Sequence, residues 1–515
     1  MRIFFGCEQQ ETVVLVIPFL SWDRVHAGGV AWTDAREPVA CDSPDGVRLE
    51  VQQARRSGEL FLPDRPWEGP YTWGQMIEDD GRYRLYYGMG LGNDEHALCV
   101  AESDDGHAWR KPNLGLVEFK GARDNNVVLA GRHVNNACVF KDPSAPPAER
   151  YKLMYFRSWW EGAPGEMLSS DEGNRRYLAN NAAGPGEARL PVALKGVMAG
   201  AASPDGYRWT VFEKPVLEEW HDTHNICRYD AARRKYVAYL RGFYAGRRAI
   251  SYSETDDFRR WPASEVIHHH TVADTPGACL YSNACTRYPD APYLHLMFPA
   301  VYHVETDHLD AQLAVSLDGK HWERHTERPI ITRGAPGAPD EGSFYPEPDL
   351  LRFRKEGKFR LLYSFSNMYH NMWLNESLRS MRRSGFGWAE WDEDRLCGIR
   401  ADADGSFAVA GVPVGTSLFA NVRCEPDSWV RFELTDRVCS PPMLRAPLEG
   451  CRFEDAQPLT GDLVHGLVTW KGRNSTSGIA GKVVVRVRLH KATIFSLTAF
   501  DAGDPAVESD PRYLV

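Results

Sequence analysis

Acidic and polar side chains gather at five places in the chain, each just before a short apolar segment. The densest of these clusters is residues 219–225, EWHDTHN, in which a carboxylate stands between two histidines. Two carboxyl groups placed across a glycosidic bond can hydrolyse it, because one protonates the leaving group while the other activates water or attacks the sugar. The candidate catalytic residues are Glu68, Asp222, Glu341 and Glu347.

The same clusters and the segments after them carry amide, hydroxyl, imidazole, guanidinium and aromatic side chains. That mixture suits a polyhydroxylated ligand, since sugar hydroxyls need hydrogen-bond partners and aromatic rings stack on sugar faces. His221 and His224 are expected to bond a sugar hydroxyl, because two histidines without a third fixed ligand do not define a zinc site. The candidate substrate-binding residues are Trp67, Tyr71, His133, Asn136, Trp159, His221, His224, Arg241, Tyr281, Tyr345 and His370.

A repeated β-hairpin follows each cluster. The second strands share one pattern of aromatic and aliphatic residues, seen in YRLYYG (83–88), YKLMYF (151–156), YVAYLRG (236–242), YLHLMF (293–298) and FRLLYS (359–364). A further motif, S-x-D-G-x-x-W, recurs at 103–109, 203–209 and 316–322. Its Asp-Gly pair predicts a tight turn, and its Trp is expected to pack between sheets.

Five such units of about four strands predict an all-β fold that begins with a five-bladed β-propeller. In a propeller the starts of the inner strands converge on one face, so the five polar clusters should line one pocket. After residue 383 the pattern changes, and KVVVRVRLH (482–490) alternates with the period of a strand. We therefore expect a propeller with an N-terminal extension over residues 1–395 and a β-sandwich over 396–515.

A Gly- and Pro-rich insertion occupies residues 157–195 in the second unit. A loop of this length is usually functional or disordered. It could bring Trp159 over the pocket, and a surface loop without a role in binding is an equal alternative.

The composition of the chain disfavours several classes of binding partner. The chain has 515 residues, a formal net charge of −10 and no basic stripe, which disfavours nucleic acid. No apolar run is long enough to span a membrane. Eleven cysteines without a CxxC pair indicate neither a disulfide framework nor a structural zinc site. We expect a cytoplasmic protein, or a secreted one if a leader has been removed, with a carbohydrate partner; a homo-oligomer is an open alternative.

These hairpins and turns resemble the five-bladed propeller glycosidases, in layout most of all the fructosidases of glycoside hydrolase family 32. Arabinosidases and xylosidases of family 43 are more distant, and bacterial proteins labelled family 32-like glycosyl hydrolases are the more specific match. The matching segments are PWEG (66–69), FKDPSAPPAERYK (140–152), DTHN (222–225), LAVSLDGKHWER (313–324) and RRSGFGW (382–388). The resemblance implies hydrolysis of a terminal sugar, which can be a furanoside.

The resemblance also implies a nucleophile or base at the start of the first blade, which by position is Glu68. Fructosidases have Asp there in an NDPNG-type motif, and neither that motif nor their Arg-Asp-Pro and Glu-Cys motifs is matched in this chain. No cofactor is implied beyond a central calcium ion, which some family 43 proteins hold. Transglycosylation, phosphorolysis and sugar binding without catalysis therefore stay open as alternatives, as does the role of each carboxylate.

Overall fold

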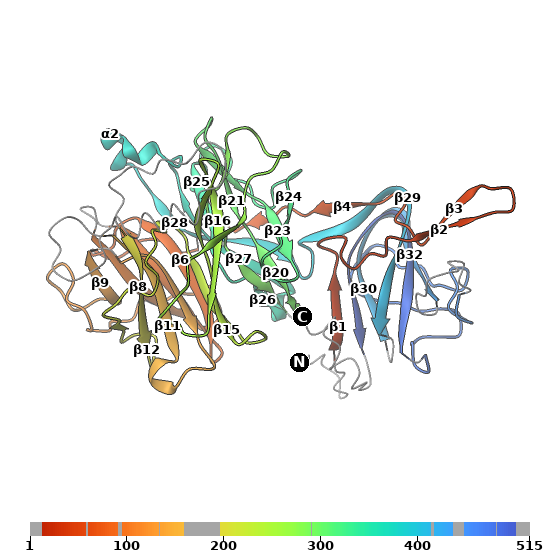
Figure 1. Cartoon of the computed structure of the whole chain (residues 1–515), viewed down its shortest axis with the longest axis horizontal. Helices are drawn as coiled ribbons and strands as arrows, with labels where there is room; N and C mark the ends of the chain where they lie inside the picture. The colour runs from red at the N-terminus through yellow and green to blue at the C-terminus, as the bar shows by residue number, and fades with distance from the viewer. Residues whose placement is uncertain are drawn as a thin grey trace.

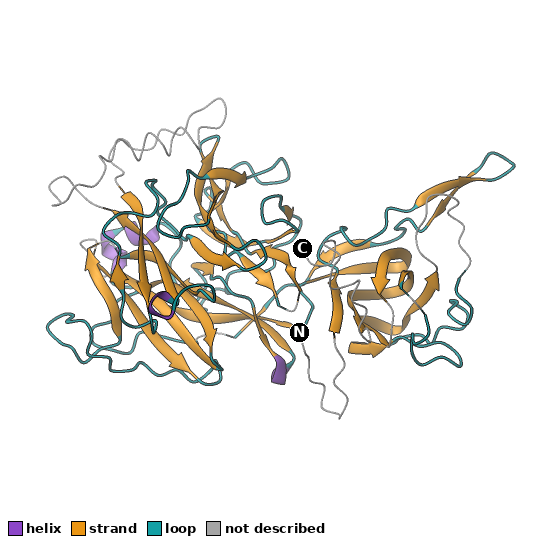
Figure 2. Ribbon diagram, turned by 60° about the horizontal axis from the view of Figure 1, so that its bottom comes forward, coloured by secondary structure: helices purple, strands orange, loops and turns teal. Residues whose placement is uncertain are grey.

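The computed structural model describes residues 13–57, 60–90, 95–132, 134–158, 196–289, 291–413, 417–435, 447–479 and 481–500. His133 and Trp159 lie outside these ranges. The described chain is built almost entirely of antiparallel strands, which confirms the all-β prediction (Figure 2). The short helices in these ranges are η1 (Pro147–Glu149), η2 (Arg354–Glu356), η3 (Met372–Leu374) and α2 (Glu376–Arg379). None of them is long and apolar enough to cross a membrane.

Four antiparallel sheets follow one another from residue 71 to residue 325 (Figure 1). The first contains β6 (Tyr71–Asp79), β7 (Arg82–Gly90), β8 (Glu95–Ser103) and β9 (Val127–Arg132). The second contains β10 (Asn135–Lys141), β11 (Tyr151–Ser158), β12 (Gly196–Ser203) and β13 (Thr210–Val211). The third contains β14 (Ile226–Asp230), β15 (Lys235–Tyr244), β16 (Arg247–Thr255) and β17 (Glu265–His268). The fourth contains β19 (Thr286–Tyr288), β20 (Ala291–Met297), β23 (Leu313–Ser316) and β24 (Glu323–His325).

The fifth sheet is assembled from two distant parts of the chain. Its strands β25 (Ser343–Pro346) and β26 (Leu351–Phe353) both pair with β27 (Lys358–Ser366), which pairs with β28 (Ser384–Asp392). The outer strand is β5 (Arg55–Arg56), from before the first sheet. A small extra sheet of β18 (Ala278–Leu280), β21 (Ala300–His303) and β22 (His308–Ala311) accompanies the fourth. The five predicted hairpin strands coincide with β7, β11, β15, β20 and β27.

The three S-x-D-G-x-x-W turns share one set of hydrogen bonds. In the first, the Gly106 amide donates to Ser103 Oγ at 2.8 Å, and Asp105 Oδ1 accepts two backbone amides at 2.8 Å each. The same bonds recur in the turns that contain Gly206 and Gly319. The three glycines have φ of 78°, 80° and 75°, which side chains rarely adopt. The predicted tight turn is confirmed at all three positions.

Contacts between rings and turns join each sheet to the next. The Gly206 carbonyl accepts from the Tyr86 hydroxyl of the first sheet at 3.2 Å, and the Gly319 carbonyl accepts from a tyrosine of the third. Aromatic pairs join the third sheet to the second and the fourth to the fifth. Tyr83 of the first sheet stacks on Phe353 of the fifth, with ring centroids 5.5 Å apart. The first sheet therefore also meets the last.

We expect Gly206→Ala to destabilise the fold by roughly 2–4 kcal/mol, the sum of backbone strain and a steric clash. A Cβ at this position would lie 2.4 Å from the Tyr86 hydroxyl oxygen. Gly81→Ala is the matched control, because Gly81 has φ of 81° with nothing within 4 Å of the added carbon. Denaturant unfolding measures both variants, and equal losses of unfolding free energy would show that the contact with Tyr86 contributes nothing.

The C-terminal sheet has six strands, and three of them are long: β29 (Cys397–Pro413), β30 (Ser417–Thr435) and β32 (Lys482–Phe500). The short strand β31 (Asp462–Leu467) pairs with β30 at one edge of the sheet. In β32 the side chains of Val485, Val487 and Leu489 are buried and alternate with more exposed residues, as expected, whereas Val483 and Val484 are both buried. Bulges interrupt the pairing of β29 and β30 with β32, and bulges let long strands bend. All six strands belong to one hydrogen-bonded sheet, so the separate layers of the expected sandwich stay a prediction.

The N-terminal extension contributes two of its five described strands to this C-terminal sheet. Strand β1 (Val13–Pro18) pairs with β32 and β4 (Arg48–Val51) pairs with β29, whereas β5 alone joins the fifth sheet. The hairpin of β2 (Gly29–Trp32) and β3 (Pro38–Cys41) extends away from the rest (Figure 1). The expected division at residue 395 places β1 and β4 with the propeller, although both pair with strands of the C-terminal sheet. The sequence did not predict this pairing, because the spacing of apolar residues indicates that a strand is buried but not which strand it pairs with.

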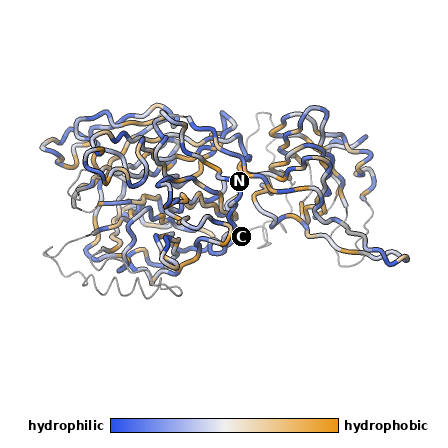
Figure 3. The backbone as a smooth tube through the Cα atoms, turned by 90° about the horizontal axis from the view of Figure 1, so that it is seen from above, coloured by the Kyte–Doolittle hydropathy of each residue, from blue (hydrophilic) through white to orange (hydrophobic). Residues whose placement is uncertain are grey.

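The structure has two lobes (Figure 3). One buried hydrophobic cluster contains residues of both. Tyr293 of the fourth sheet, Leu361 of the fifth and Phe432 of the C-terminal sheet belong to the same buried cluster. The Tyr293 hydroxyl also donates to the Val16 carbonyl of β1 at 2.7 Å. The C-terminal sheet is thereby held against the fourth and fifth sheets.

Candidate functional site

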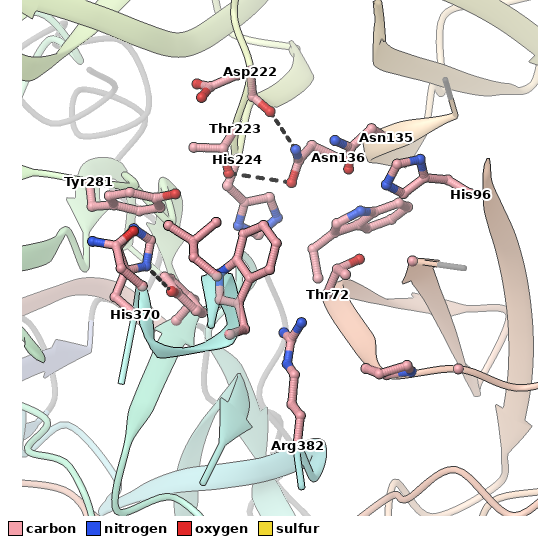
Figure 4. Close-up of a pocket in the computed structure, with 18 of the residues that line it drawn as sticks. Thr72, His96, Asn135, Asn136, Asp222, Thr223, His224, Tyr281, His370 and Arg382 are labelled. Carbon is pink, nitrogen blue, oxygen red and sulfur yellow. Dashed lines mark hydrogen bonds between the residues drawn. The ribbon is translucent and has the colours of Figure 1, made fainter. Parts of the chain in front are cut away.

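A cavity of about 880 Å³ lies where the first strands of the five sheets begin. Segments that enter or lie in β6, β10, β14 and β25 line it, as does the segment after β18 that leads to β19 (Figure 4). The described side chains that line it include Thr72, Trp73, His96, Lys120, Asn135, Asn136, Asp222, Thr223, His224, Arg248, Tyr281, Tyr345, His370, Asn371, Trp373, Leu374, Arg379 and Arg382. Of the residues that the sequence predicts for the site, the structure brings six together there: Asn136, Asp222, His224, Tyr281, Tyr345 and His370.

Asp222 presents its carboxylate at the wall of this cavity. Its side chain is 34% exposed, and Oδ1 lies 3.2 Å from Nη1 of Arg241, whose side chain is only 1% exposed. Arg241 is itself fixed, because Nη2 donates to the Tyr281 carbonyl and the guanidinium lies 4.5 Å from the centroid of the Tyr281 ring. Asn136 Nδ2 donates to the Asp222 carbonyl and holds the backbone. Among the described residues that line the cavity, Asp222 is the one carboxylate.

A second acidic group lies behind His224. His224 Nε2 is 3.1 Å from Oε2 of Glu347, whose side chain is fully buried. Burial raises the pKa of Glu347 well above its ordinary value, and burial lowers the pKa of His224 to about 4. Near neutral pH the pair is therefore uncharged. The Glu347 carboxyl oxygens have no hydrogen-bond partner in the structure, and Oε2 lies within reach of His224 Nε2. Only His224 of this pair lines the cavity.

This burial predicts a pH-dependent stability that Glu347→Gln should change. A raised pKa in the folded state means that the native protein holds a proton which the unfolded chain loses above about pH 4.5. Above about pH 6.5 wild-type stability should therefore fall as pH rises, by up to about 1.4 kcal/mol per pH unit while Glu347 stays protonated in the native state. The side chain at position 347 does not titrate in the glutamine variant. The free energy of unfolding of the variant should therefore exceed that of the wild type by an amount that grows as pH rises.

Denaturant unfolding at intervals from pH 5 to pH 9 measures this difference. Between about pH 4.5 and 6.5 the lowered pKa of His224 makes stability fall as pH falls, a loss that the glutamine variant should show and that the opposite slope from Glu347 offsets in the wild type. Parallel curves above pH 6.5 would mean that Glu347 is ionised in the folded protein.

An aromatic wall forms another side of the cavity. The Tyr345 hydroxyl lies 2.5 Å from Nδ1 of His370, and the His370 ring centroid is 4.4 Å from that of Tyr281. Burial lowers the pKa of His370 to about 4, so a neutral imidazole accepts from Tyr345. Arg248 lies over the Tyr281 ring, 5.1 Å from its centroid. This wall combines aromatic rings with fixed polar groups.

The rim of the cavity was missed by sequence reasoning. Trp373 and Leu374 in η3 line it and are 40% and 57% exposed, and Arg379 of α2 lies over the Trp373 ring. Arg382 lines the cavity just before β28 begins. Their position in the sequence could have indicated them, because they follow His370 closely and lie between two strands of one sheet, β27 and β28.

Glu68 lies outside the cavity in a closed network. Its side chain is fully buried. Oε1 accepts from the hydroxyls of Tyr71 and Tyr87 at 3.0 and 2.7 Å, and Oε2 accepts from Lys111 Nζ at 2.8 Å. Two backbone amides at residues 64 and 65 also donate to Oε2. All of its lone pairs face protein donors, so the geometry favours a structural role for Glu68 and for Tyr71.

The other expected site residues also have protein partners away from the cavity. Glu341 accepts from the Gly337 amide at 2.6 Å, as a turn cap does. Trp67 donates to Asn126 Oδ1 at 3.3 Å. His221 is buried between the Arg241 carbonyl, 2.7 Å away, and Glu219. The buried Arg241 does not line the cavity and pairs with the Asp222 carboxylate.

Calcium has no evident place among these side chains. Calcium takes six to eight oxygen ligands, usually with several carboxylates. The described side chains of the cavity offer one carboxylate amid cations. Across the described ranges no cluster of three or more His, Cys, Asp or Glu could hold a metal ion.

Sequence comparison gives short matches only. No model of a protein family matches the chain. An uncharacterized protein of Mycobacterium tuberculosis, strain H37Rv, is 30% identical over 114 residues. The match covers 21% of this chain and 37% of that protein, and an uncharacterized protein of strain CDC 1551 matches over the same shares. The aligned region thus spans less than two-fifths of these relatives.

Several solved structures have a similar layout. An N-acetylgalactosamine deacetylase from F. plautii, in complex with blood group B trisaccharide, has a TM-score of 0.42 at 15% identity, over 69% of this chain and 96% of its own. An α-L-arabinofuranosidase from Podospora anserina, in complex with cellotriose, has a TM-score of 0.38 at 12% identity, over 67% and 98%. A family 117 glycoside hydrolase from Zobellia galactanivorans has a TM-score of 0.37 at 10% identity, over 66% and 90%.

Proposed function

We propose that the protein is a glycoside hydrolase that removes a terminal sugar in the described cavity. In this proposal the five sheets are the blades of a five-bladed β-propeller, and the C-terminal sheet folds as a β-sandwich beside it. The contacts between consecutive sheets, and between the first and the fifth, support a closed ring. The pocket then lies at the centre of the ring, where ligands of propellers bind.

One observation carries the catalytic part of the proposal. A carboxylate with a fixed counter-ion, Asp222 with Arg241, and a protonated buried carboxyl group, Glu347 behind His224, serve the same cavity. Glycoside hydrolysis needs this pair of states, one carboxylate and one carboxylic acid. Burial keeps Glu347 protonated, and Asp222 has Arg241 as its counter-ion.

The proton path follows from the contacts. Asp222 either attacks the anomeric carbon, forming a glycosyl ester that water then hydrolyses to free the sugar and the carboxylate, or takes a proton from the attacking water and later releases it to solvent. His224 gives its Nδ1 proton to the departing glycosidic oxygen while Nε2 receives the proton of Glu347. The imidazole stays neutral throughout, and the proton that Glu347 loses is restored from solvent after the product leaves. Glu347 thereby acts through His224, since His224 is the member of the pair that faces the ligand.

The test is product release from a panel of chromogenic pyranosides and furanosides, each with and without phosphate and with EDTA. The proposal expects one sugar to be cleaved in the absence of phosphate and in the presence of EDTA. Turnover that requires phosphate would instead identify phosphorolysis. Transfer to an added sugar acceptor would identify transglycosylation.

Sugar binding without catalysis is the second candidate. A single carboxylate among the described lining residues favours it, because hydrolases usually place two in the pocket. A glycoside that the protein binds and that is recovered intact after long incubation would decide for this function.

A further inference from the structure

Four cationic side chains line the cavity, and their charges are not balanced. They are Lys120, Arg248, Arg379 and Arg382. Within the described part of the chain, none of the four has a carboxylate within ion-pair distance. The one carboxylate on the described wall, Asp222, is already matched by Arg241. The pocket is therefore positively charged in a protein whose net charge is −10.

This imbalance is local. Elsewhere, buried cations have partners: Arg324 pairs with Asp274, Arg352 with Glu393 and Asp394, and Arg360 with Glu356 and Glu390. A charge taken out of water is costly unless a partner compensates it. Arg248 and Arg382, which are partly buried, thus depart from the pattern that the rest of the fold follows, whereas Lys120 and Arg379 are exposed.

Arg382 shows the effect most clearly. Figure 4 shows its guanidinium reaching into the cavity from the segment before β28. Burial lowers the pKa of Arg382, because the cation is largely withdrawn from solvent. Because no carboxylate of the described residues pairs with Arg382, an anionic group of a ligand would compensate its charge.

Arg248 completes the arrangement. Its guanidinium lies over the rings of Tyr281 and Tyr302, 5.1 and 5.9 Å from their centroids, and its Nε has no hydrogen-bond partner. A planar guanidinium presents paired donors that match a carboxylate, sulfate or phosphate group. Lys120 and Arg379 add positive potential that attracts an anion.

We infer that the cavity takes an acidic sugar, one whose ring bears a carboxylate, sulfate or phosphate group that Arg382 and Arg248 bind. This inference rests on the proposed function, because it names the class of sugar that the proposed hydrolase accepts. The aromatic wall and Trp373 contact the apolar faces of the ring, and Asp222 stays directed at the anomeric centre.

The test compares acidic and neutral sugars of the same configuration by calorimetry, on the Asp222→Asn variant so that no ligand is consumed. The pairs are methyl glucuronide with methyl glucoside and methyl galacturonide with methyl galactoside, and sulfated and phosphorylated galactose form further arms. The acidic member of at least one set should bind roughly ten- to a hundredfold more tightly than its neutral counterpart. The arm that binds best identifies the anionic group.

Arg382→Gln should reduce the preference for the acidic sugar to within about twofold. Arg383→Gln is the matched control, because Arg383 is the next residue in the chain, is exposed and does not line the cavity. A parallel measurement needs no sugar: sodium sulfate should raise the melting temperature of the wild type and of Arg383→Gln more than that of Arg382→Gln.

Equal affinity for both members of every pair, or equal effects of sulfate on all three proteins, would overturn the inference. Tight binding of free phosphate with no preference among the sugars would also overturn it, and would favour phosphorolysis. The proposed function fails separately: if Asp222→Asn cleaves a glycoside as fast as the wild type, hydrolysis at this carboxylate is wrong, although a preference for acidic sugars would stand.

Discussion

Asp222→Asn is expected to lower kcat roughly a hundred- to ten-thousandfold on any glycoside that the wild-type protein cleaves. The amide keeps the size of the side chain but neither attacks a sugar carbon nor accepts a proton from water. The fold should be retained, because the Arg241 guanidinium keeps its hydrogen bond to the Tyr281 carbonyl and its place over the Tyr281 ring. Steady-state kinetics and a melting curve on the same preparation measure both effects.

Glu341→Gln is the matched control for this experiment. Glu341 is acidic and was predicted for the same site, but its carboxylate accepts a backbone amide outside the cavity. Its kcat should stay within about twofold of the wild-type value. A loss in the control as large as that of Asp222→Asn, or full activity in Asp222→Asn, would remove Asp222 from the mechanism.

Glu68→Ala is expected to reduce the free energy of unfolding by about 3–5 kcal/mol, the cost of removing one partner of a buried ion pair. The change leaves the Lys111 ammonium, whose side chain is 4% exposed, with the largely exposed Asp64 as its one remaining carboxylate. It also leaves the Tyr71 and Tyr87 hydroxyls without their acceptor. Denaturant unfolding measures the loss.

The activity of the folded Glu68→Ala protein separates a structural role from a catalytic one. Below the melting temperature, kcat per folded molecule should stay within a few-fold of the wild-type value. Glu68→Ala with Lys111→Met removes both charges and should be less destabilised than Glu68→Ala alone, because no buried cation is left unpaired. An inactive variant with unchanged stability would instead support the catalytic role that position in the first sheet suggests.

The contrast between Asp222 and Glu68 shows how far sequence reasoning reaches. Both stand just before an inner strand, and the repeat correctly placed both at strand starts. Whether a carboxylate faces the cavity depends on remote groups: Lys111 and Tyr87 enclose Glu68, whereas Arg241 leaves Asp222 open on one side. No local pattern records those partners.

Residues outside the repeat were the ones that sequence reasoning missed. Trp373, Arg379 and Arg382 lie between β27 and β28, in a segment without a recurring motif, and they reach the cavity because the fifth sheet places that segment above it. Glu347 was expected in the pocket and lies behind His224, one layer deeper. The partners of β1 and β4 could not be predicted either, because the local spacing of apolar residues carries no information on which distant strand a strand pairs with.

The pairing of β1 with β32, and of β5 with β28, bears on how the protein is made. A ribosome releases the first member of each pair early and the second very late, so two sheets stay incomplete through most of translation. The turn-linked sheets between them can close as each emerges, since their strands are near neighbours in the chain. During that delay the apolar face of β1 stays uncovered, and we expect the incomplete chain to be prone to aggregation at this strand.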